Sequence, residues 1–334
     1  MLVRWECQWP SIRYVLLELP LALGITTTKG VDIEGEELSE KEMWEALPTS
    51  SGQEKAELLI KLAHQATHRG SSEEALALAE TAREIYEEMG ATTADAALAD
   101  AYVGIGHSLR KLHREEDAVK AIANAVDIYR RDQYPFVDDL LRTQAGWYGD
   151  IGDWQSALNC YQEAVVLNEV DGNQEWLARS LFSAGWCLIR LDQFADAYSN
   201  FRRARDIFKS LGMIEQVGWC DERSAHCAYK LGDYLEAATL GSVAQNVAFF
   251  CQNTKFHANA HLVLARAHIA LGDYEKASNH IVDAQALAGF TDEKDWQLIV
   301  DIEQERANHC RVQGMEDSAR EIEARLATIR DVLG

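Results

Sequence analysis

The sequence predicts an all-α protein built from antiparallel helix-turn-helix repeats, and three observations support this. All four prolines (Pro10, Pro20, Pro48 and Pro135) precede residue 136, so the last 199 of the 334 residues hold no helix breaker. Small residues return at fixed offsets in seven copies. A hydrophobic content of 47% supplies a core and excludes wholesale disorder.

Each copy has a small residue, a turn residue seven positions on, an alanine twelve on and an alanine nineteen on, which Leu326 replaces in the last, weaker copy. Two antiparallel helices approach closely only where side chains are small, and glycine suits the left-handed backbone that ends the first helix. The seven copies are Ala63, Gly70, Ala75, Ala82; Gly106, His113, Ala118, Ala125; Ala145, Gly152, Ala157, Ala164; Gly185, Asp192, Ala197, Ala204; Ala225, Gly232, Ala237, Ala244; Ala265, Gly272, Ala277, Ala284; and Ala307, Gly314, Ala319, Leu326.

The turn residues predict where each second helix begins. Gly-Asp recurs at 152–153, 232–233 and 272–273, and an aspartate in this place is a favoured N-cap. Ser71-Ser-Glu-Glu74 and Asp233-Tyr-Leu-Glu236 have the pattern of capping boxes. Because one hairpin buries a single face, neighbouring hairpins must stack to complete a core.

Residues 231–237 (LGDYLEA) and 271–277 (LGDYEKA) resemble the tetratricopeptide repeat (TPR) family. The likeness covers roughly residues 53–334 and implies a right-handed superhelical solenoid of about seven repeats. Two features depart from the family. The second-helix alanines are 43, 39, 40, 40, 40 and 42 residues apart rather than about 34, and the proline near the end of the second helix is missing. The long period is similar to variants in bacterial peptide-sensing regulators and in cell-polarity and motor adaptors.

We therefore expect an N-terminal extension, residues 1–52, before a solenoid of residues 53–334. The extension has an apolar stretch, residues 14–25, that is too short and too interrupted for a membrane span or a signal peptide. An acidic connector with a short helix, 39–47, follows. The expected hairpins are about 53–90, 96–131, 137–170, 175–211, 215–250, 255–289 and 295–333, the last being a charged terminal cap.

The chain is strongly acidic, with a formal net charge of −22 and a pI near 4.8. Such a surface argues against general binding to nucleic acid or to anionic membranes. The seven cysteines contain no C-x-x-C pair, which favours reduced, buried thiols and a cytoplasmic protein. The oligomeric state is not predicted.

In the TPR family the first helix of each hairpin lines the concave surface, which places candidate binding residues three and four positions apart on one face. Of twenty-one such positions, six are Arg or Lys, four are His and one is acidic, against the acidic balance of the whole chain. We expect a basic concave channel for an acidic or phosphorylated segment. The candidates are His64, His68, His107, Arg110, Lys111, Arg142, Arg179, Trp186, Arg190, His226, Tyr229, Lys230, Arg266 and Arg311. The alternative is that these cations pair with acids of the next repeat.

No sequence motif indicates an enzyme. The sequence has no P-loop, no G-x-S-x-G and no H-E-x-x-H, so neither a catalytic site nor a cofactor is expected. Histidines one helical turn apart, His64/His68 and His257/His261, could hold a metal, but no third ligand is evident and helical coincidence is the preferred interpretation. The sequence thus favours a protein- or peptide-binding scaffold, with a peptide-responsive regulatory sensor as the alternative.

Overall fold

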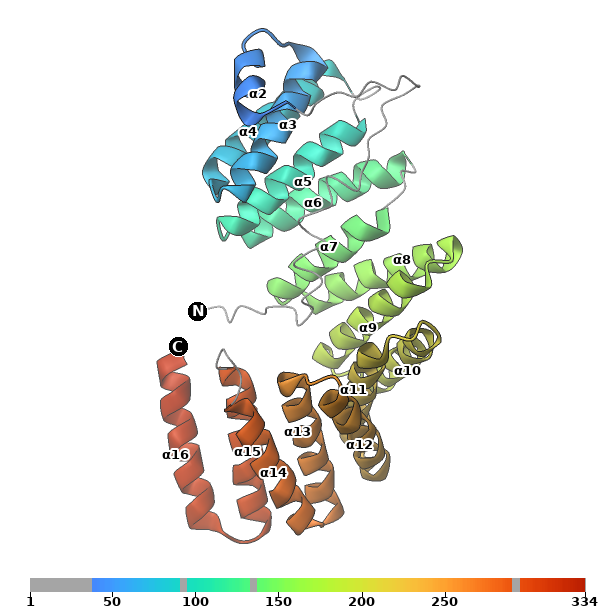
Figure 1. Cartoon of the computed structure of the whole chain (residues 1–334), viewed down its shortest axis with the longest axis vertical. Coiled ribbons are helices and arrows are strands. Elements are labelled where there is room, and N and C mark those ends of the chain that lie inside the picture. The colour runs from blue at the N-terminus through green and yellow to red at the C-terminus, as the bar shows by residue number, and fades with distance from the viewer. Residues whose placement is uncertain (1–37, 91–94, 133–136, 290–294, 334) are drawn as a thin grey trace. The chain divides into compact units, whose positions relative to one another are not determined.

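The computed structural model describes residues 38–90, 95–132, 137–289 and 295–333 (Figure 1). The chain forms two compact units. Unit 1 comprises residues 1–137 and unit 2 residues 138–334. The described residues form fifteen helices and no strand, which confirms the predicted all-α fold. The apolar stretch 14–25 lies outside the described residues, and the treatment of 1–52 as a separate extension stays a prediction.

Unit 1 is a run of helices in which each packs against the next. Helix α2 begins with a capping box: Ser39 accepts the backbone N–H of Glu42, whose carboxylate accepts the Ser39 N–H at 2.7 Å. Buried Met43 packs against Leu58 and Leu62 of α3. The helices are α2 (Glu40–Ala46), α3 (Gly52–His68), α4 (Ser72–Met89), α5 (Asp95–Lys111) and α6 (Glu115–Arg131).

Unit 2 continues the same pattern of helical hairpins. The two helices of each hairpin from α9 onward pack on each other, and Cys160 of α8 contacts Gln144 of α7 at 3.5 Å. The helices are α7 (Val137–Asp150), α8 (Trp154–Asp171), α9 (Gln174–Arg190), α10 (Phe194–Ser210), α11 (Ile214–Leu231), α12 (Tyr234–Phe250), α13 (Thr254–Leu271), α14 (Tyr274–Ala288), α15 (Trp296–Val312) and α16 (Glu316–Leu333).

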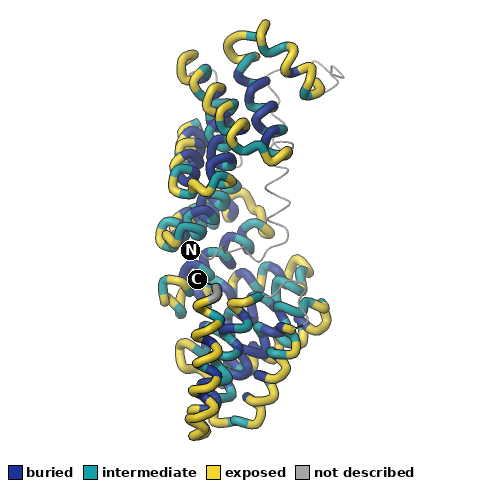
Figure 2. The backbone as a smooth tube through the Cα atoms, turned by 90° about the vertical axis from the view of Figure 1, so that its left-hand side faces the viewer, coloured by how far each residue is buried: buried dark blue, intermediate teal, exposed yellow. Residues whose placement is uncertain are grey.

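The small residues of the repeat frame lie at the helix crossings, as predicted. Every packing position of the seven copies is buried, and the buried residues of each unit are dark blue in Figure 2. Gly185 shows why size matters: a Cβ on this residue would lie 2.8 Å from Cε1 of Phe201 on α10. Close approach of the helices therefore depends on these side chains staying small.

The turns follow the frame even where glycine is replaced. Gly152, Gly232 and Gly272 have φ of 82°, 87° and 77°, the left-handed conformation that glycine adopts without strain. His113 and Asp192 occupy the same frame position and take φ of 59° and 58°. The fold therefore imposes this backbone geometry on side chains that rarely adopt it.

Three of the predicted helix caps are confirmed, and one predicted capping box is wrong. Asp153, Asp233 and Asp273 each accept the backbone N–H three residues on, as expected of N-caps. The box predicted at Ser71 is wrong, because Ser71 makes no side-chain cap and the Glu74 carboxylate binds Arg69 at 3.0 Å.

The box predicted from Asp233 to Glu236 forms only in part. Asp233 accepts the Glu236 N–H at 3.1 Å. The Glu236 carboxylate instead accepts the Tyr198 hydroxyl of α10 at 3.1 Å. A contact from the preceding repeat has thus replaced the local one.

The described cysteines are free thiols, and all except half-buried Cys251 are buried, which agrees with the expected reduced, packed state. Burial raises the pKa of the Cys220 and Cys227 thiols, so neither is an activated nucleophile. Cys7 lies outside the described residues. None of the described helices combines the length and apolarity that crossing a bilayer requires.

Candidate functional site

One side of α9 carries alternating aromatic and basic side chains. Trp176, Arg179, Trp186 and Arg190 are three, seven and four residues apart, which brings them to one face of the helix. Trp176 receives two guanidinium groups: Arg142 of α7 lies 4.0 Å and Arg179 5.4 Å from its ring centroid. A tryptophan face attracts a guanidinium through its quadrupole, so this ring orders both arginines.

Helix α11, the first helix of the next hairpin, also carries cations that lie over aromatic rings. Arg223 lies 4.5 Å from the ring centroid of Trp186, and the Lys230 ammonium lies 5.8 Å from that of Phe194. The His226 ring meets the Phe194 ring edge-to-face at 6.3 Å. We call the following residues the basic-aromatic strip: Trp176, Arg179, Trp186 and Arg190 of α9 with Arg223, His226 and Lys230 of α11.

The repeat itself explains the two outermost cations of the strip. Trp154 and Phe194 are the first residues of α8 and α10, and the cation thirty-six residues later lies over each ring: Arg190 over Trp154 at 4.9 Å, and Lys230 over Phe194. One repeat further on, α12 begins with Tyr234, but the residue thirty-six positions later is the uncharged Ala270, so the pattern ends there. Tyr234 packs instead against the Tyr229 ring at 5.7 Å.

Carboxylates meet several of the predicted cations. Arg142 is held by Asp138 at 2.5 Å and by Asp139, and Arg179 by Glu175 at 2.6 Å, all on the same helices. Arg311 pairs with Glu323 of α16. Arg266 of α13 pairs with Glu305 of α15 at 2.9 Å, which is the alternative considered from the sequence: a cation bound by an acid of the next repeat. Arg190 and Lys230 are exposed at the C-terminal ends of α9 and α11.

His226 of the strip and Glu222 beside it are shifted toward their neutral forms. Burial, with Arg266, Arg223 and Lys230 nearby, lowers the pKa of His226 to about 3. Burial raises the pKa of Glu222, whose carboxylate lies 3.0 Å from Arg223. His226 therefore contributes a neutral donor and acceptor at pH 7 rather than a positive charge.

Comparison with known proteins identifies the repeat. A family model described as tetratricopeptide repeat matches residues 140–210, which contain α8, α9 and α10 and most of α7. The chain therefore carries tetratricopeptide repeats (TPR) at residues 140–210. A search of curated protein sequences gave no match.

Solved structures share the fold of this TPR protein at low identity. The apo form of RapI is 14% identical with a TM-score of 0.65, over 86% of this chain and 91% of that one. A TPR protein from Parabacteroides merdae is 14% identical with a TM-score of 0.58, over 82% and 93%. A signal transduction ATPase with a TPR sensor from Pyrococcus horikoshii is 16% identical with a TM-score of 0.63, over 88% and 45%. These likenesses show the fold, which is consistent with protein binding.

The candidates in unit 1 of the TPR protein have a different setting. Burial lowers the pKa of His64 and, together with Arg110, brings that of His107 to about 4, so both imidazoles are neutral at pH 7. Lys111 donates to the Thr67 carbonyl oxygen at 2.9 Å, near the C-terminal end of α3, where a cation is favourable. His68 is exposed. This group belongs to unit 1 and the strip to unit 2, so each is a separate candidate surface.

Sequence reasoning missed Trp176 and Arg223, which complete the strip. Trp176 precedes Trp186 by ten residues, close to three helical turns, and this spacing was a readable signal. The candidate positions all follow a packing position, whereas Arg223 precedes the packing position Ala225 by two residues. Arg223 was therefore not among them.

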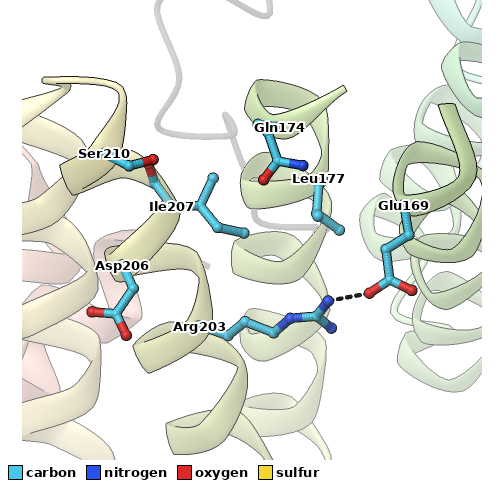
Figure 3. Close-up of a pocket in the computed structure, with 7 residues that line it drawn as sticks. All are labelled: Glu169, Gln174, Leu177, Arg203, Asp206, Ile207 and Ser210. Atoms are coloured by element: carbon cyan, nitrogen blue, oxygen red, sulfur yellow. Dashed lines mark hydrogen bonds and ion pairs between the residues drawn. The ribbon is translucent and has the colours of Figure 1, made fainter. Parts of the chain in front are cut away.

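A pocket of about 490 Å³ lies on another part of the TPR protein, between α8 and α10 beside the start of α9 (Figure 3). Arg203 of α10 reaches across to Glu169 of α8, and Leu177 and Ile207 supply apolar walls. None of its lining residues was a candidate, because the sequence frame directed attention to the first-helix faces alone.

Proposed function

We propose that this TPR protein binds an acidic or phosphorylated peptide segment of a partner protein along the basic-aromatic strip. The observation that carries the proposal is the repeated stacking of cations on rings: Arg142 and Arg179 on Trp176, Arg223 on Trp186, Arg190 on Trp154 and Lys230 on Phe194. A stacked guanidinium is oriented and still donates hydrogen bonds from its edge, the geometry that carboxylate and phosphate groups accept.

The charge balance of the chain supports this assignment. With a net charge of −22, positive groups gathered on two neighbouring helices differ in sign from the average surface. An acidic segment is therefore drawn to the strip and repelled elsewhere, which orients the ligand before contact. The tryptophans add apolar area beside the cations, a combination common at the energetic centres of protein interfaces.

Binding of a labelled acidic peptide tests the proposal directly. We expect a fluorescein-labelled poly-glutamate peptide to bind the full chain at low salt and to dissociate at high salt, because exposed charges are screened. Arg190→Glu with Lys230→Glu should weaken the affinity about ten-fold or more, the equivalent of one or two charge-assisted hydrogen bonds. Fluorescence anisotropy measures both effects.

The matched control is Arg320→Glu with Arg325→Glu, which changes the net charge equally on exposed positions of α16. This control should leave binding nearly unchanged. Equal loss in both double variants would show that overall charge and not the strip attracts the peptide, and unchanged binding in the Arg190/Lys230 variant would refute the proposal.

A regulatory sensor is the second candidate. It is supported by the fold shared with the Pyrococcus horikoshii structure, which is described as carrying a TPR sensor. Small-angle scattering separates the two roles: a sensor should change its radius of gyration when the peptide saturates it, whereas a scaffold should keep the same value.

A further inference from the structure

Four histidines of unit 2 gather where α13 packs on α14. His257, His261 and His268 belong to α13, and His280 belongs to α14. The His261 ring is the centre of the group: its Nδ1 lies 3.1 Å from Nδ1 of His280, and its Nε2 lies 3.2 Å from Nε2 of His257. His268 stacks on His280 with the ring planes 16° apart. Neither the repeat packing nor the proposed peptide site uses this cluster.

A carboxylate completes a set of three ligand atoms. Oδ2 of Asp283, one helical turn after His280, lies 3.6 Å from Nδ1 of His261. One ligand atom from each of His261, His280 and Asp283 lies within 4.8 Å of the other two, and no other group of three such ligand atoms gathers this closely in the part of the chain that the structure describes. The third ligand that sequence spacing did not reveal thus comes from the second helix of the hairpin.

The separations suit a metal ion between these atoms. Tetrahedral zinc binds His nitrogen and carboxylate oxygen at roughly 2.0–2.2 Å, which places two ligand atoms about 3.4 Å apart. The observed 3.1 Å and 3.6 Å lie on either side of that value. Two imidazoles and one carboxylate are also a donor set that borderline divalent cations prefer.

The surroundings favour an oriented ligand set. His261 is only 3% exposed, so packing holds its ring in place. With Nδ1 given to a metal, the proton of His261 lies on Nε2, which donates to Nε2 of His257. Such a hydrogen bond from the second ring nitrogen fixes the tautomer and the orientation of metal-binding histidines.

We propose that His261, His280 and Asp283 bind a divalent transition-metal ion, best matched by Zn²⁺, and that His257 positions His261. Asp283 is more than half exposed, so the ion reaches the site from solvent and keeps a water molecule as a further ligand. The ion links α13 to α14 and stabilises that hairpin, because the metal binds the folded arrangement and not the unfolded chain.

Calorimetric titration of the chelator-treated full chain with ZnCl₂ tests the site. We expect one ion per chain at this site and a rise in the melting temperature with Zn²⁺. His280→Gln and Asp283→Asn should each weaken binding by more than the roughly 10- to 100-fold that losing an outer partner costs. His257→Gln should have an effect within that smaller range, because it removes the outer partner alone.

The matched control is His64→Gln with His68→Gln, which removes a histidine pair of the same helical spacing from α3. This variant should bind Zn²⁺ as the unaltered chain does. Substitution with Co²⁺ adds a spectroscopic check: visible bands of a four-coordinate nitrogen-oxygen site support the proposal, and thiolate-to-cobalt absorption would assign the metal to cysteines. Absence of binding, or equal affinity in His280→Gln, Asp283→Asn and the control, would overturn it.

Discussion

Units 1 and 2 share one packing frame and differ in the chemistry of their first-helix faces. In both, the small residues of the frame are buried. In unit 2, α8 and α10 begin with Trp154 and Phe194, and Arg190 and Lys230 lie over these rings. In unit 1 the corresponding helix α4 begins with Ser72, and Lys111 of α5 binds a backbone carbonyl instead. The frame therefore fixes how helices pack, while the residue that opens the second helix decides what a cation on the neighbouring helix contacts.

A matched pair of glycines tests the packing half of this comparison. Gly185→Ala in unit 2 drives a Cβ to within 2.8 Å of Phe201, so we expect a loss of about 1–3 kcal/mol in the free energy of unfolding. Gly104→Ala in unit 1 places its Cβ 3.6 Å from Ala79, an ordinary contact, and should stabilise by about 0.5–1 kcal/mol through helix propensity. Urea unfolding followed by circular dichroism measures both. Similar shifts in the two variants would mean that the crossings are not size-limited.

The loss of stability at acid pH provides a comparison of one buried histidine in each unit. The pKa of folded His226 is about 3 and that of His107 about 4, against about 6.5 in an unfolded chain. Below pH 6.5 the unfolded state therefore binds protons that the folded state does not, so stability falls as the pH drops toward 4.

Glutamine substitutions isolate each contribution. His226→Gln and His107→Gln should each reduce the stability lost between pH 7 and pH 5 by about 2 kcal/mol. Urea midpoints at the two pH values give the difference. A variant that loses as much stability as the unaltered chain would show that its histidine also titrates normally when folded.

The smallest expected effect concerns the two turn positions of the repeat frame where another residue replaces glycine, one in each unit. His113 and Asp192 have positive φ, which costs an L-residue free energy that glycine does not incur. His113→Gly and Asp192→Gly should therefore each stabilise by at most about 1 kcal/mol, with part of the gain offset by the greater entropy of the unfolded chain. Denaturant midpoints at neutral pH measure the change. Destabilisation by either substitution would show that the native side chain contributes more than its strain costs.

The sequence alone determined the repeat, because its signals are local. Small residues at crossings, positive φ at the turn and an aspartate cap such as Asp153 depend on neighbours within one hairpin. The pairing of Arg142 with Asp138, four residues away, was equally readable.

Tertiary structure decided the contacts between helices. Glu305 pairs with Arg266, which lies thirty-nine residues earlier in the chain. The Glu236 carboxylate accepts a hydrogen bond from Tyr198 of another helix and so does not complete its local capping box. The packing of α14 on α13 brings His280 and Asp283 close to His261. The histidine pair His64/His68 has the same spacing as His257/His261, yet only the second meets such partners. Spacing along one helix fixes a face, whereas the side chains that meet that face depend on how neighbouring helices pack against it.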